Sequence, residues 1–116
     1  MRYSLGMEEP TRDHGPQPLE QLMTQWNLTN HGMVKASAEQ LNHKQVQKAR
    51  SGRQLTLHLM QKVTRAFNAA VVAGLDKETR AAFVEYPHRQ LFSYAKNHDP
   101  AWRDPNEAIL PPPPSA

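Results

Sequence analysis

The stretch NHGMVKASAEQLNHKQVQKARSG, residues 30–52, decides how this chain folds. Its second half begins at Asn42, a residue type that caps helices, and stops at Gly52, a residue type that ends them. Between these two, only Val46 and Ala49 are apolar, so the helix has one narrow face that can pack on a core. The other positions of this helix are polar or basic, and none is acidic. The pattern predicts a short helix docked by one edge, with a polar outer surface.

Helical spacing of apolar residues continues on both sides of this stretch. Before it, an apolar face follows Pro18, a residue that suits a first helical turn. A second helix is expected to begin at Thr29 or Asn30, and a longer one after Thr56, ending within residues 70–74. No pair of alternating segments indicates a sheet. The residues expected in the core of these helices are Leu19, Leu22, Met23, Trp26, Met33, Val34, Val46, Ala49, Leu59, Met60, Val63, Ala66, Phe67 and Ala70.

The predicted fold class is therefore all-α: a compact domain of four to six helices that contains a helix-turn-helix, with flexible ends. The helix-turn-helix domain is expected to span residues 18–74. Residues 1–17 have no periodic apolar face and are expected to be a disordered tail. Residues 111–116 begin with four prolines and form a second, extended tail.

Residues 75–110 are expected to form a helical C-terminal extension. Asp76 can cap a short helix that reaches about Val84, and Pro87 can begin another. That second helix would carry three apolar residues on one side: Leu91, Phe92 and Ala95. Trp102, Ile109 and Leu110 would lie on the domain or in a subunit contact.

Charge is distributed unevenly along the chain. Residues 30–66 contain seven basic residues and one acid, Glu39, a net charge of +6. Since the whole chain carries +3, the remainder carries −3. A local positive field of this kind attracts phosphate groups, while the acidic remainder limits nonspecific adhesion.

Several function classes have no support in the sequence. There is no cysteine, which removes disulfides, thiol nucleophiles and cysteine-based metal sites. The six histidines form no HExxH motif and no i, i+4 pair on a predicted helix, and no Gly-rich phosphate loop or GxSxG elbow occurs. We therefore expect no enzyme, no metal and no cofactor. No apolar run has the length of a membrane span and the N-terminus lacks an apolar signal region, so a cytoplasmic protein without membrane contact is expected.

The run LTNHGMVKASAEQLNHKQVQKARSGRQLTLHLMQKVTRAFNA resembles the lambda-repressor-like (Cro/repressor-type, XRE) helix-turn-helix family. The resemblance covers residues 18–70, about half the chain. It departs from the family in the turn, where a glycine is usual and Ala38 stands here, and where the connection is longer. It implies a transcriptional regulator that binds double-stranded DNA through the helix of residues 42–51, either as a monomer or as a homodimer on two half-sites.

The resemblance also implies roles for single residues. His43, Lys44 and Lys48 match positions that face base edges, and Gln45 and Gln47 lie beside them, where glutamine suits adenine. The complete set of residues expected to contact DNA is Asn30, Asn42, His43, Lys44, Gln45, Gln47, Lys48, Arg50, Arg53 and Gln54. Of these, Asn30, Arg50, Arg53 and Gln54 match positions near the phosphate backbone.

Two other functions compete with DNA binding. The chain could be a protein-interaction module on the same scaffold, which the long turn, the C-terminal third and the expected exposure of Phe92, Tyr94 and Trp102 would favour. RNA binding by the basic face is the third reading, although the sequence shows no aromatic platform on which bases could stack.

Overall fold

A computed structural model of the chain describes residues 13–111 and is all-helical over that range, apart from one isolated β-bridge between Asp13 and Arg53. The predicted all-α fold class is confirmed. Residues 1–12 and 112–116, most of the two predicted tails, lie outside the described residues. The elements are α1 (Pro18–Gln25), α2 (Asn30–Ala36), α3 (His43–Ser51), α4 (Leu57–Ala73) and α5 (Lys77–Ala82), followed by the single 3-10 turns η1 (His88–Gln90) and η2 (Glu107–Ile109).

Four of the helices begin at a capping side chain. The first backbone N–H groups of a helix have no partner within the helix, so a side-chain oxygen that accepts from one of them stabilises the start by about 1 kcal/mol. The side chains of Thr29, Asn42, Thr56 and Asp76 each accept a hydrogen bond from the backbone N–H three residues later, at 2.7–3.2 Å. All four caps were expected from the sequence.

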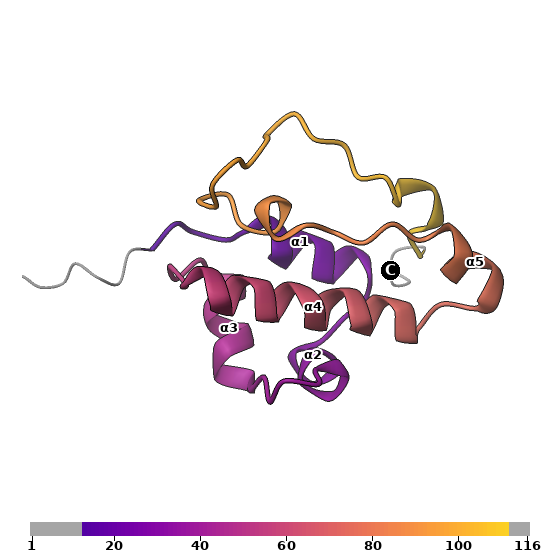
Figure 1. Cartoon of the computed structure of the whole chain (residues 1–116), viewed down its shortest axis with the longest axis horizontal. Helices are drawn as coiled ribbons and strands as arrows, with labels where there is room; N and C mark the ends of the chain where they lie inside the picture. Colours follow the sequence, from indigo (N-terminus) through magenta and orange to yellow (C-terminus); the bar gives the residue numbers. More distant parts are fainter. Residues whose placement is uncertain (1–12, 112–116) are drawn as a thin grey trace, which may run out of the picture.

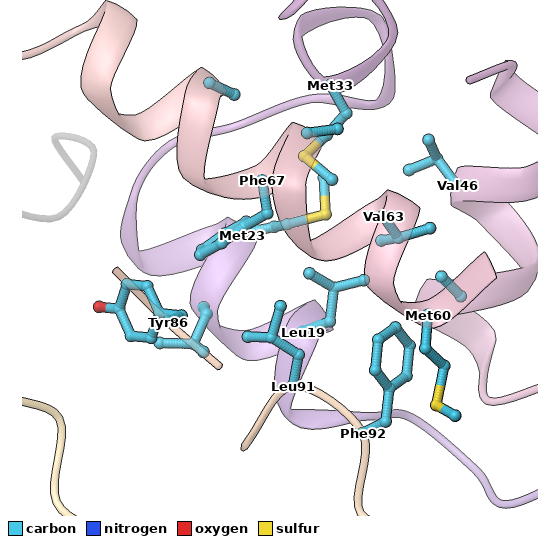
Figure 2. Packing of buried hydrophobic residues seen from close by; sticks show 14 of the residues in the cluster. Leu19, Met23, Met33, Val46, Met60, Val63, Phe67, Tyr86, Leu91 and Phe92 are labelled. Atoms are coloured by element: carbon cyan, nitrogen blue, oxygen red, sulfur yellow. The ribbon is translucent and has the colours of Figure 1, made fainter. Parts of the chain in front are cut away.

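Helix α4 is the centre of the domain. It packs against α2 and α3 on one side, with α1 beside it (Figure 1). Figure 2 shows side chains from α1, α2, α3 and the chain near residue 91 gathered along α4, with Val46 of α3 pointing toward it. The side chains with no exposed surface include Leu19, Met23, Met33, Val46, Ala49, Val63, Phe67, Leu91 and Phe92.

The connection between α2 and α3 is built without glycine. The backbone at Gln40 takes the left-handed conformation with φ 60°, which costs a non-glycine residue about 1–2 kcal/mol. Two contacts hold the turn in place: Leu41 is buried in the core, and the Glu39 carboxylate accepts two hydrogen bonds from Arg65 of α4 at 2.6 and 2.7 Å. The position expected to replace the family's glycine, Ala38, is not the left-handed one.

Residues 13–17 are packed on the domain, so the prediction that they belong to a disordered tail is wrong. The backbone N–H of His14 donates to the carbonyl oxygen of Gly52 at 2.8 Å, and the His14 ring stacks on Tyr94. Gln17 is 3% exposed and its Oε1 accepts from the backbone N–H of Ser93 at 2.7 Å. These partners are distant in sequence, which is why no local pattern indicated them.

The C-terminal extension is mostly irregular rather than helical. Asp76 caps α5 as expected, but the helix predicted from Pro87 is only the turn η1. The extended backbone before it is held by two buried asparagines. Asn68 bonds both the N–H and the C=O of Tyr86, at 2.8 and 3.0 Å. Asn106 does the same for Val84, at 2.8 and 2.7 Å.

The aromatic residues whose exposure would favour an interaction module are partly or fully buried in this extension. Phe92 is fully buried. Tyr94 is half-buried and its hydroxyl accepts from the backbone N–H of Leu55 at 2.9 Å. Trp102 is half-buried against the ring of Tyr86. These three residues therefore do not form the fully exposed aromatic surface that favoured an interaction module.

Among residues 13–111 no helix combines the length and the apolar character needed to cross a membrane.

Candidate nucleic-acid interface

The outer face of α3 is open to solvent. Val46 and Ala49, neither of them exposed, attach the helix to the core, as the sequence predicted. The chain from residue 83 to 111 runs along the other side of α1 and α4, away from α2 and α3 (Figure 1). Its hydrogen bonds near α3 come from Tyr94, which contacts the loop after the helix. Along the open face, Lys44, Gln47 and Ser51 are exposed and Lys48 is half-buried.

This region keeps most of its positive charge. Of its seven basic side chains, two are paired with carboxylates: Arg50 with Glu20, and Arg65 with Glu39. The other five form no ion pair with any residue in the described part of the chain: Lys35, Lys44, Lys48, Arg53 and Lys62. A segment that combines these cations with an acid-free helix is suited to a polyanion.

Arg50 joins three helices. Its Nε and Nη2 donate to the two carboxylate oxygens of Glu20 in α1, at 2.5 and 3.0 Å, and its Nη1 donates to Asn30 Oδ1 in α2 at 2.6 Å. The hydrogen bonds from Arg50 lower the pKa of Glu20 below its usual value. Arg50 was expected to contact the DNA backbone, but its guanidinium is occupied here by Glu20. The sequence analysis missed Glu20, because the two residues are 30 positions apart and no local pattern links them.

Asn30 and Gln47 are also brought together. Asn30 Nδ2 donates to Gln47 Oε1 at 3.2 Å, so both ends of the Asn30 amide have partners. Three of the predicted DNA-contacting residues therefore form one hydrogen-bonded chain that links α2 to α3. Of the three, Gln47 lies on the exposed face.

Two of the residues predicted to contact DNA, Asn42 and Gln45, cap the start of α3. Asn42 Oδ1 accepts from the backbone N–H of Gln45 at 2.8 Å, and Gln45 Oε1 accepts from the backbone N–H of Asn42 at 3.2 Å. This reciprocal capping box satisfies two N–H groups at once and occupies the carbonyl end of Gln45. Gln45 is half-buried, so it lies at the border of the face rather than on it.

The remaining predicted residues lie around the two ends of α3. His43 is exposed and its ring stacks near that of His31, with centroids 6.0 Å apart. At the other end, the Gln54 Oε1 is 3.1 Å from His14 Nε2. The Arg53 backbone pairs with Asp13, and its side chain is exposed. Of the predicted basic residues, Lys44 and Arg53 are thus exposed, and Lys48 is half-buried.

Within residues 13–111 no three histidine, aspartate or glutamate side chains come together as metal ligands. No protein-family model, curated protein or solved structure matches this chain. Membership of the lambda-repressor-like family therefore stays a prediction, and any functional argument must come from the surface itself.

Proposed function

We propose that the protein binds double-stranded DNA by laying the outer face of α3 in the major groove, and that it acts as a transcriptional regulator of the lambda-repressor-like type. The observation that carries the proposal is the acid-free outer face of α3, where the exposed Lys44 and the half-buried Lys48 lie one helical turn apart. An α-helix fits the major groove, where lysine can donate to guanine O6 and N7. Arg53, just after the helix, is placed to contact a phosphate.

The cations around this face supply affinity by a simple mechanism. Each lysine or arginine that neutralises a phosphate releases condensed counterions, so the affinity falls as salt rises. Five basic side chains of this region have no carboxylate partner in the described residues. A solvated helix surface would ordinarily mix acids with its bases, and α3 does not.

The proposal is tested by fluorescence anisotropy with a mixed-sequence duplex at a series of salt concentrations. Wild type should bind at low salt. The slope of the logarithm of the binding constant against the logarithm of the salt concentration should fall in magnitude by about one when a phosphate-contacting cation is removed, as in Arg53→Ala. Lys48→Ala should lower affinity and change the preferred sequence if Lys48 contacts a base.

Lys77→Ala is the matched control, because Lys77 is an exposed lysine of α5, at the opposite end of α4 from α3 (Figure 1). It should bind as wild type does. Absence of binding at low salt, or an equal loss in Lys77→Ala and Arg53→Ala, would contradict the proposal. Competition with structured RNA separates duplex DNA from RNA as the ligand, and stronger competition by RNA would also count against it.

A further inference from the structure

We infer that Glu20, Arg50 and Asn30 together set which end of the Gln47 side-chain amide faces outward from α3. They thereby decide which base groups Gln47 can read. The last step of this inference rests on the proposed DNA binding, whereas the orientation of the amide does not.

The orientation begins at Arg50, because a guanidinium can only donate hydrogen bonds. Glu20 takes the Nε and Nη2 donors, at 2.5 and 3.0 Å, and holds the group in one plane. The remaining Nη1 donates to Asn30 Oδ1 at 2.6 Å. An amide has its acceptor at one end and its donors at the other. The carbonyl end of Asn30 is therefore held against Arg50 and its NH₂ end is left for Gln47.

The same reasoning orients Gln47. Asn30 Nδ2 donates to Gln47 Oε1 at 3.2 Å. If the Gln47 amide turned over, two NH₂ groups would face each other and this hydrogen bond would be lost. The Gln47 Nε2 group is thus the free end, and no residue in the described part of the chain accepts from it. Gln47 is exposed, so this donor is available to a ligand.

A donor that projects from a major-groove helix requires an acceptor on the base. Purines present one at N7, guanine adds O6 and thymine presents O4, whereas cytosine presents only its N4 donor there. We therefore expect the base contacted by Gln47 to be a purine or thymine and not cytosine. A glutamine whose amide could turn over freely would also accept a hydrogen bond from the N4 amino group of cytosine through Oε1.

Asn30→Asp tests this, because it exchanges the donor that faces Gln47 for an acceptor. Arg50 can still donate to one oxygen of Asp at position 30, and the other oxygen now requires Gln47 to donate. The Gln47 amide should turn over and present Oε1, so that cytosine, which the wild-type donor disfavours, becomes a preferred base at one position. His31→Asp is the control: it places the same negative charge on the adjacent exposed residue, which makes no hydrogen bond to Gln47 in the structure.

The measurement is selection from a randomised duplex library with wild type and both variants. Both variants should bind more weakly than wild type, but only Asn30→Asp should change the preferred base. Glu20→Ala is a second test that does not depend on the folding of Asn30→Asp. It should weaken the preference at that one position. An unchanged preference in Asn30→Asp and in Glu20→Ala overturns the inference while leaving DNA binding intact.

A second readout needs no DNA. In the free protein, NMR should show fast water exchange for the Gln47 Nε2 protons of wild type and slowed exchange in Asn30→Asp. Slowed exchange of these protons in wild type overturns the proposed orientation. If no duplex is retained by any of the proteins, the proposed function fails, and the NMR result alone decides the orientation of the amide.

Discussion

Gly52 is the position where a single methyl group should do the most harm, because two separate effects add there. Its φ of 99° lies in the left-handed region, which costs a residue with a Cβ about 1–2 kcal/mol. In addition, a Cβ at this position would lie 1.8 Å from the carbonyl oxygen of Gly15 and 2.5 Å from its carbon. Both are backbone atoms, so no flexible side chain can move aside.

In Gly52→Ala the chain of residues 13–15 would therefore have to move away from α3. The hydrogen bond from the His14 N–H to the Gly52 carbonyl would be lost with it, which costs about 0.5–1.5 kcal/mol. Together with the backbone strain, we expect Gly52→Ala to lower the free energy of unfolding by about 1.5–3.5 kcal/mol. That corresponds to a fall in melting temperature of roughly 4–8 °C for each kcal/mol in a domain of this size.

Gly15→Ala is the matched control, because Gly15 also has a positive φ, 76°, but nothing lies within 4 Å of an added Cβ. It should cost only the backbone strain, about 1–2 kcal/mol. Urea unfolding followed by tryptophan fluorescence gives both values. If Gly52→Ala is no more destabilising than Gly15→Ala, the close approach of residues 13–15 to α3 does not exist in solution and this reasoning is refuted.

Three further predictions concern buried and paired groups. Burial raises the pKa of Tyr86 above its ordinary value of 10.0, so the native state keeps the hydroxyl proton to a higher pH than the unfolded chain does. The stability of the fold should therefore fall as the pH rises above about 10, and Tyr86→Phe should flatten that fall in thermal melts. Asn68→Ala should lower the free energy of unfolding by about 2–4 kcal/mol in urea, since it leaves both buried backbone groups of Tyr86 without partners; a loss below about 1 kcal/mol would argue against this role. The hydrogen bonds from Arg50 lower the pKa of Glu20, so the stability from this pair is present above about pH 4.5 and disappears as the pH falls below it. Glu20→Gln should therefore reduce the acid sensitivity of the melting temperature. Identical profiles of melting temperature against pH for wild type and Glu20→Gln would contradict the pairing.

Much of the candidate site was predictable because its features are local. Asn42 and Gln45 lie three residues apart, which is the spacing of a capping box, and Gly52 stands where α3 must end. Val46 and Ala49 are the only apolar residues of that helix, so they had to face the core. The exposure of Lys44 follows from the same periodicity.

The parts that were not predictable depend on partners far apart in the chain. Arg50 has the same appearance in the sequence as Arg53, yet one is paired with Glu20 and the other projects into solvent. Exposure of Phe92 and Trp102 was part of the interaction-module alternative, but Phe92 is fully buried and Trp102 is half-buried, in a segment that buried asparagines hold in place.

The sequence by itself determined where the helices α1 to α5 begin, where α3 ends, and which of their faces are apolar, because caps and periodicity act within a few residues. Only the tertiary structure decided which cations of the α3 region are neutralised, which way the Gln47 amide points, and how residues 83–111 attach. Those outcomes depend on hydrogen bonds between groups 17 to 30 positions apart, and the chain must already be folded before such groups can meet.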